Sequence, residues 1–220
     1  PRDDIYRHRH GSRGHGRDHV LPAFISPSLT VPVLGGRRTL GTWQSVVLVD
    51  TNADNPDRNA KQALDLLAAP LALKADRVHE MPASDGNLGL DEAAEAYARE
   101  LDDVVFDICL LGMGPDGHVA SIFPEHPSSY ADGDVIAVRS SPKPPPERIS
   151  LTLPVINRSL EVWFVVSGAD KAAATKMALL GAGPVQVPAA GVSGVERTLW
   201  LMDRDAAAEL PTDLQQRGRI

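Results

Sequence analysis

A short apolar run that ends in a glycine-rich loop constrains the fold of this chain more than any other feature. Residues 106–110 (F-D-I-C-L) predict a buried strand, and three glycines follow within residues 112–117. Glycine lets the backbone approach a ligand closely and adopt positive φ. Asp116 and His118 stand at the end of this loop. A strand, a glycine turn and an acid–histidine pair are together typical of an active-site loop.

The length and composition fit one α/β domain of ordinary size. The chain has 220 residues, of which 43% are apolar. Its only cysteine, Cys109, lies in the predicted strand, so no internal disulfide can form and a reducing cytoplasm is expected. No apolar run approaches the roughly 20 residues of a membrane helix, and no signal-peptide pattern is visible. We therefore expect a cytoplasmic protein with no membrane partner.

The first part of the chain differs in composition from the rest. Residues 1–50 carry seven arginines, no lysine and four aspartates, whereas residues 51–220 carry a net charge of −10. Histidines alternate with arginines and glycines before Val20, without helical or strand periodicity. A nucleic-acid arm and a metal-binding tract are alternatives, but an unstructured or non-native leader is favoured. The acidic body argues against a general nucleic-acid binder.

The sequence becomes regular from about Ala53, and two short apolar runs before it also predict strands. Strands are expected at residues 29–34, 46–49, 105–111, 135–138, 148–153, 162–166 and 198–202. Helices are expected at residues 58–67, 91–101, 119–123, 154–159, 170–180 and 205–210. This alternation predicts an α/β fold over residues 53–220: a mostly parallel, Rossmann-like sheet with helices on both faces. Ligands of such folds bind beyond the carboxyl ends of the strands, where the loop 112–118 and the turn at Gly168 fall.

The glycines of the loop also match, formally, the dinucleotide-binding fingerprint. Gly112, Gly114 and Gly117 have its spacing. The fingerprint also requires an uninterrupted helix after the third glycine and an acidic residue at the end of the next strand. Here Pro124 cuts the predicted helix short. Dinucleotide binding is therefore a weaker interpretation than substrate binding by the same glycines.

His118 follows the third glycine, at the predicted start of a helix. The positive end of a helix dipole disfavours imidazolium, so a neutral histidine there can take a proton from water. Asp116 is close enough in sequence to orient or polarise the imidazole. In the alternative interpretation, Asp116 caps the helix and His118 is a surface residue.

Two cationic residues are candidates for binding negative charge on a substrate. Lys171 falls in the first turn of a predicted helix, where its charge opposes the helix dipole and an anionic partner would offset the cost. Arg148 follows the stiff segment S-P-K-P-P-P at residues 141–146 and begins a strand. Solvated or structural roles remain alternatives for both, and Lys143 is expected to face solvent.

Several segments together resemble the 6-phosphogluconolactonases, within the glucosamine-6-phosphate isomerase/6-phosphogluconolactonase family. The resemblance covers residues 53–210 and looks most like the actinobacterial branch. Its segments are N-P-D-R-N-A-K-Q at residues 55–62, L-G-M-G-P-D-G-H-V-A-S-I-F-P at 111–124, S-P-K-P-P-P-E-R-I-S-L-T-L-P at 141–154, V-S-G-A-D-K at 166–171 and T-L-W-L-M-D-R-D-A-A-A at 198–208.

The resemblance implies hydrolysis of 6-phospho-D-glucono-1,5-lactone to 6-phospho-D-gluconate, in the oxidative pentose phosphate pathway, without cofactor or metal. It implies that His118 is the general base and that Asp116 assists it. Backbone N–H groups of the glycine loop would stabilise the oxyanion. The other substrate-binding residues that it implies are Gly112, Gly114, Gly117, Arg148, Lys171 and Asn59.

The segment before Ala53 departs from the family pattern. The family carries a T-G-G loop upstream and a D-E-R triplet where Val47, Leu48 and Val49 stand here. One hypothesis is that residues 1–52 are translated out of frame and that the family's frame resumes near Ala53. Sequencing the DNA across codons 40–60 tests it: an uninterrupted frame with no alternative frame encoding T-G-G and D-E-R would refute it.

Two other functions remain open at this level. A glucosamine-6-phosphate deaminase or a sugar-phosphate isomerase would share the architecture, although the proline-rich motif favours a lactonase. A sugar-phosphate-binding protein without catalysis would fit the missing upstream motifs. The expected partner is a small sugar phosphate, with no nucleic acid, and the expected state is a monomer.

Overall fold

The computed structural model of the chain describes residues 78–83, 86–102 and 104–217, together with three short strands before residue 50. Those strands are β1 (Val33–Leu34) and β2 (Arg37–Arg38), which pair antiparallel, and β3 (Val46–Leu48). β1 and β3 fall inside two of the predicted strands. The predicted helix at residues 58–67 lies outside the described residues.

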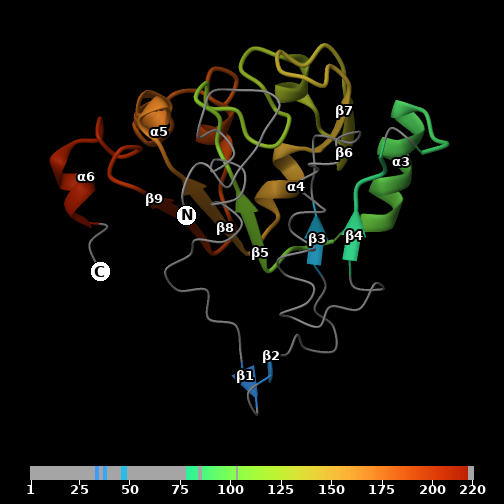
Figure 1. The fold of residues 1–220 in the computed structure, drawn as a ribbon, viewed down its shortest axis with the longest axis horizontal. Coiled ribbons are helices and arrows are strands. Elements are labelled where there is room, and N and C mark those ends of the chain that lie inside the picture. Colours follow the sequence, from blue (N-terminus) through green and yellow to red (C-terminus); the bar gives the residue numbers. More distant parts are fainter. Residues whose placement is uncertain are drawn as a thin grey trace, which may run out of the picture.

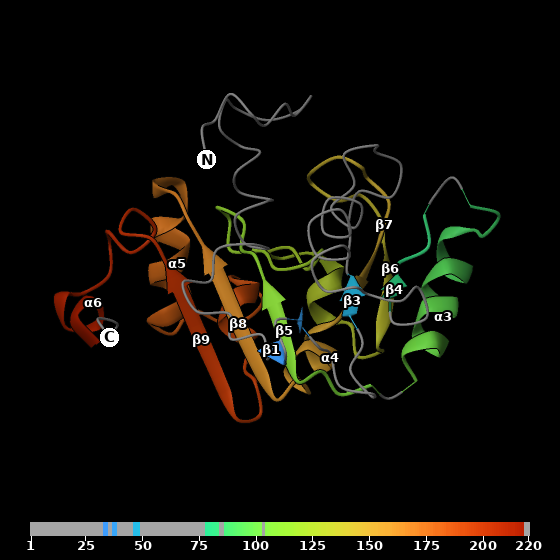
Figure 2. The same ribbon diagram turned by 60° about the horizontal axis from the view of Figure 1, so that its bottom comes forward.

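The centre of the molecule is a parallel sheet in the order β5-β8-β9. β5 (Ile108–Leu111) and β9 (Arg197–Met202) pair on either side of β8 (Glu161–Val166), with Leu111 opposite Phe164 and Phe164 opposite Trp200. β3 pairs in parallel with β4 (Val78–Glu80). Figures 1 and 2 show β9, β8 and β5 side by side, with α5 beside β8 and β9. The predicted α/β fold with a parallel sheet is confirmed.

Parallel pairing brings three chain segments to one edge of this sheet. β5 runs into the glycine loop, β8 into the turn at Gly168, and β9 into Asp203. Because carboxyl ends of parallel strands meet at one edge, residues separated by some ninety positions become neighbours there. This edge is where the candidate site is found.

An antiparallel pair stands beside the parallel sheet. β6 (Val135–Val138) pairs with β7 (Arg148–Leu151), and α3 (Leu90–Leu101) packs against both. α3 begins with two acids, which suits the positive end of its dipole, and it buries Tyr97 completely. α4 (Leu153–Asn157) follows β7 directly and is capped by the Thr152 hydroxyl, which accepts from the Val155 N–H.

The remaining helices lie in the C-terminal part of the chain. Lys171 ends the short 3₁₀ segment Ala169–Lys171, and α5 (Ala172–Leu179) continues from it. Further 3₁₀ turns cover Pro127–Tyr130 and Pro188–Gly191. α6 (Thr212–Arg217) lies at the opposite end of the molecule from α3 (Figure 1). No helix in the described ranges has the length and apolar character that crossing a bilayer requires.

The strand before the glycine loop is shorter and less buried than its sequence predicts. β5 begins at Ile108 rather than Val105, and Ile108 and Leu110 are 43% and 47% exposed. A continuous apolar run suggests burial on both faces, but in this strand only the face that carries Leu111 is well covered.

The helix predicted at residues 119–123 is wrong. Val119 and Ile122 instead form an isolated antiparallel bridge around a tight turn, with Ala120 at φ 48°. The turn buries Val119, Ile122 and Phe123, and the same spacing of apolar residues is what a helix face would show. His118 therefore does not begin a helix, and the dinucleotide fingerprint lacks the helix that it needs.

The helix predicted at residues 205–210 is also wrong. This stretch is a series of turns, and the helix α6 follows it instead. The Asp203 carboxylate accepts the Ala206 N–H at 2.7 Å, which offers the backbone an alternative to helical pairing. Its other oxygen accepts the Gly168 N–H at 3.0 Å, so Asp203 ties the end of β9 to the turn after β8.

The two hydrogen bonds accepted by Asp203 lead to a prediction about stability. We expect Asp203→Ala to lower the free energy of unfolding by about 1–2 kcal/mol, because two backbone N–H groups lose a charged acceptor at a partly exposed site. Denaturant unfolding measures it. Asp205→Ala, in the same exposed turn, is the matched control and should change stability by less than about 0.5 kcal/mol. Equal losses in the two variants would contradict the role given to Asp203.

Candidate active site

The glycine loop closes on itself through its backbone. The Gly114 N–H donates to the His118 carbonyl at 3.0 Å, and the Gly117 N–H donates to the Gly114 carbonyl at 2.9 Å. Gly117 has φ 82°, and a Cβ there would press against Val187. Because both N–H groups are used inside the loop, they are not the donors available to an oxyanion.

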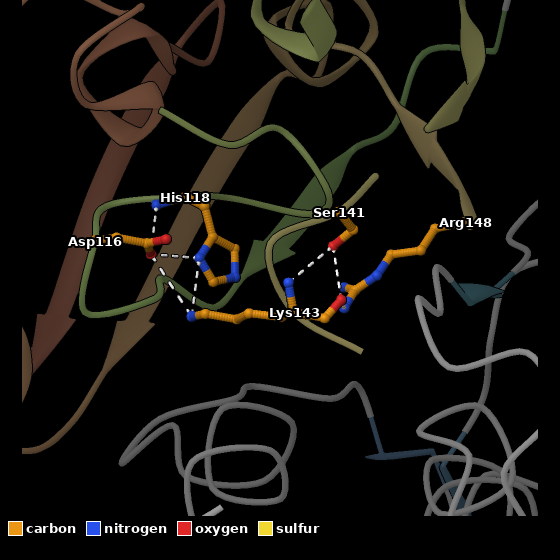
Figure 3. A network of polar contacts seen from close by, with 5 residues as sticks. All are labelled: Asp116, His118, Ser141, Lys143 and Arg148. Carbon is orange, nitrogen blue, oxygen red and sulfur yellow. Dashed lines mark hydrogen bonds and ion pairs between the residues drawn. The ribbon is translucent and has the colours of Figure 1, made fainter. Parts of the chain in front are cut away.

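The closed loop brings Asp116 and His118 together. Asp116 Oδ1 lies 2.5 Å from His118 Nδ1, which makes Nδ1 the protonated nitrogen of a neutral imidazole (Figure 3). His118 Nε2 has no hydrogen-bond partner among the described residues. Gly114 is required for this contact, because a Cβ at that position would overlap the His118 ring and Asp116 Oδ1.

Burial and charge keep this pair in the ionisation states that a general base needs. Burial lowers the pKa of His118; Asp116 opposes this effect, and the charges of Lys143 and Arg148 add to it. Burial alone would raise the pKa of Asp116, but the hydrogen bond from His118 and the charges of His118 and Lys143 hold it well below its usual range. His118 is therefore neutral and Asp116 ionised near pH 7.

Lys143 also belongs to this site, which sequence reasoning missed. It is half-buried, and its Nζ lies 3.4 Å from His118 Nδ1 and 3.7 Å from Asp116 Oδ1 (Figure 3). The expectation that it faces solvent is wrong. The available signal was its place in the rigid proline segment before Arg148, since a stiff loop fixes the direction of the side chain that it carries.

Arg148 lies at the start of β7, 6% exposed, and holds the proline segment by its backbone. Its Nε donates to the Pro145 carbonyl at 2.9 Å, and its terminal nitrogen donates to the Lys143 and Pro144 carbonyls at 2.7 Å each. The guanidinium also lies 5.5 Å from the centre of the Phe123 ring, and that ring contacts His118. The structure thus places Arg148 beside the Asp116–His118 pair.

Lys171 is buried, with 6% of its surface exposed, so a solvated role is wrong. Within the described ranges, no carboxylate forms an ion pair with its ammonium. Burial lowers the pKa of Lys143. Asp116 opposes this effect, and the charges of Lys171 and Arg148 add to it. The cations Lys143, Arg148 and Lys171 thus lie close enough to influence one another, and among the described residues the Asp116 carboxylate lies beside Lys143.

The other predicted site residues have different outcomes. Gly112 has open space where a Cβ would stand, so packing does not explain a glycine there. Asn59 lies outside the described residues. In the described part of the chain, no group of three or more His, Cys, Asp or Glu side chains is arranged to hold a metal ion.

Fold and site together define an α/β protein whose sheet edge carries a carboxylate–imidazole pair among cations. Residues 47–200 match the family described as glucosamine-6-phosphate isomerases/6-phosphogluconolactonase. The chain therefore belongs to this family.

Individual relatives agree with this assignment. A 6-phosphogluconolactonase of Streptomyces coelicolor is 51% identical over 173 residues, which cover 73% of this chain and 66% of that protein. One of Mycobacterium tuberculosis is 51% identical over 170 residues, covering 72% and 69%. The crystal structure of the Thermotoga maritima 6-phosphogluconolactonase has a TM-score of 0.64 at 32% identity and covers 72% of each chain. This chain thus spans about two thirds of the length of the curated lactonases.

The N-terminal segment has a different relationship. Residues 1–65 match a second family, described as UPF0047 protein YjbQ-like. A UPF0047 protein of M. tuberculosis is 69% identical over 61 residues, which cover 28% of this chain and 46% of that protein. The change of composition near Ala53 thus falls where the two family matches overlap. A joining of two families' sequences is an alternative to the reading-frame hypothesis, which stays a prediction.

The loop geometry yields a prediction about the tautomer of His118. We expect Gly114→Ala to displace the imidazole, because the new Cβ would occupy its position, whereas Gly112→Ala should leave the imidazole in place. Side-chain ¹⁵N NMR measures whether Nδ1 carries the proton. A wild-type tautomer in the Gly114→Ala variant would contradict the loop geometry described above.

Proposed function

We propose that this chain hydrolyses 6-phospho-D-glucono-1,5-lactone to 6-phospho-D-gluconate, as a carboxylic ester hydrolase of the oxidative pentose phosphate pathway. The observation that carries the proposal is the Asp116–His118 pair at the surface of the sheet edge, with Nδ1 bonded to the carboxylate. The names of relatives that are 51% identical over 173 and 170 residues support the substrate.

In the proposed mechanism, His118 Nε2 accepts a proton from water while the water oxygen attacks the lactone carbonyl carbon. The bond from that carbon to the ring oxygen then breaks, and the imidazolium returns its proton to that oxygen. Asp116 stabilises the transient imidazolium through Nδ1–H. A lactone is an activated ester, so a positioned water and one base suffice for catalysis.

The cations of the site suit a substrate that carries a phosphate. Lys171 is buried and Lys143 half-buried, and among the described residues Lys171 has no carboxylate partner. Burying unpaired charge is unfavourable, and a dianionic ligand offsets that cost. We assign Lys171 to the phosphate because it forms no ion pair within the described residues.

The direct test is lactone hydrolysis by the purified chain, with glucose-6-phosphate dehydrogenase generating the lactone in place. We expect a rate well above the spontaneous one, and a fall of about 100-fold or more in His118→Ala. A folded chain that binds the sugar phosphate without turnover would point instead to a binding protein. Ammonia release from glucosamine 6-phosphate would point to a deaminase.

The pH dependence follows from the state of His118. Because burial holds its pKa below the ordinary value of 6.5, we expect kcat/KM to fall only below that pH. Titration of the substrate phosphate adds its own effect near pH 6. The same assay with unphosphorylated gluconolactone separates the two, since only the histidine limb remains there. An acid limb above pH 6.5 with that substrate would contradict this assignment.

The phosphate assignment has its own test. Lys171→Met should raise KM for the phosphorylated lactone at least about tenfold and leave kcat/KM for gluconolactone nearly unchanged, because only the former carries the phosphate. Lys176→Met is the matched control, since Lys176 lies on α5 with its Nζ 3.9 Å from Glu209. Equal effects of Lys171→Met on the two substrates would remove Lys171 from the phosphate site.

A further inference from the structure

Lys143 of the proline segment has a relation to His118 that the proposed mechanism does not use. Lys143 places its ammonium 3.4 Å from Nδ1, the nitrogen opposite the one that would accept the proton from water. It also lies 3.7 Å from Asp116 Oδ1, so it faces the hydrogen bond between the two residues (Figure 3). A cation at this place disfavours a second proton on the imidazole.

The position of Lys143 depends on a clamp on its own backbone. Arg148 donates to the carbonyls of Lys143, Pro144 and Pro145, and each of these hydrogen bonds is 2.9 Å or shorter. Ser141 closes the other side of the turn, because its hydroxyl donates to the Lys143 carbonyl at 2.8 Å. Four hydrogen bonds thus hold three consecutive carbonyls, and three of the bonds come from one guanidinium.

We propose that Arg148 is a positioning residue that holds the proline segment, and that Lys143, so held, keeps His118 unprotonated. Lys143 then controls the protonation state of His118: its positive charge disfavours the imidazolium at the pH at which the base must act. The inference rests on the proposed function for its purpose, since only a general base has to be neutral before the reaction.

Other charged and titratable groups around His118 affect its protonation in different directions. Asp116 acts in the opposite direction and favours the imidazolium. Arg148 contributes its own charge from β7, and Phe123 contacts the ring without charge. His126 lies against Phe123, with its Nε2 3.0 Å from the Arg139 carbonyl, and it faces that ring rather than His118. Among the described residues, Lys143 is thus the cation within hydrogen-bond distance of the imidazole.

The experiment is an NMR titration of the His118 side chain in the full chain, assigned by the signal lost in His118→Asn. Lys143→Met should raise the proton affinity of His118 about tenfold, because it removes the charge and keeps a side chain of similar length. Lys143→Arg should leave the midpoint close to that of the wild type. Lys176→Met, far along α5, is the surface control.

Arg148→Lys separates positioning from direct charge. It retains the positive charge but loses the planar set of donors, so a released loop should raise the His118 midpoint in the same direction as Lys143→Met. The double variant Lys143→Met/Arg148→Lys should behave like Lys143→Met alone, since there is then no ammonium left to position. If Arg148→Lys fails to fold, Ser141→Ala replaces it, because it removes another hydrogen bond to the Lys143 carbonyl without changing any charge.

The outcomes distinguish this inference from the proposed function. An unchanged His118 midpoint in Lys143→Met overturns the role of Lys143, and independent effects in the double variant overturn that of Arg148. Neither readout requires turnover. A chain that titrates as expected but does not hydrolyse the lactone refutes the proposed function and leaves the electrostatic role of Lys143 in place. In an active chain, Lys143→Met should also move the acid limb of kcat/KM to higher pH.

Discussion

Parallel pairing of β8 with strands on both sides is the constraint on which the rest of the site depends. β5 and β9 register against β8 so that all three end at the same edge, although they are far apart in the sequence. That register places the glycine loop, the turn before Lys171 and Asp203 side by side, and the bond from the Gly168 N–H to Asp203 adds to it. The core beneath them holds the register, with Phe164 and Trp200 stacked at 3.9 Å. The chemistry of the site is thus built on strands whose positions are already fixed.

At this edge, backbone groups do much of the positioning that side chains do in other sites. Gly114 and Gly117 close the loop that presents Asp116 and His118, and Arg148 binds three carbonyls of the proline segment. Lys143 shares the Asp116 carboxylate with His118, and Lys171 forms no ion pair among the described residues. This imbalance is what suits the site to a negatively charged ligand.

Much of this arrangement could be predicted from the sequence, and the failures have a common cause. The strands at residues 135–138, 162–166 and 198–202, and the helix that ends at Leu101, follow from apolar patterns and end signals of the local sequence. The pairing of Asp116 with His118 was expected from their spacing in a glycine loop. By contrast, the helices expected at residues 119–123 and 205–210 give way to contacts that the spacing of apolar residues does not reveal: the bridge between Val119 and Ile122 in one case and the Asp203 carboxylate in the other. Lys143 was missed for the same reason, because its direction is set by Arg148 from the next strand.

The way in which Arg148 holds the proline segment has a consequence for how this site tolerates mutation. Every proline-loop atom that Arg148 contacts through a hydrogen bond is a carbonyl oxygen, and all residues possess one. Side chains at the prolines can therefore be exchanged, within the limits of the backbone path, without removing an acceptor. The arginine itself has no equivalent, since no other side chain offers its planar set of donors. Sequence drift in this loop should thus be broader at the prolines than at Arg148, which holds them.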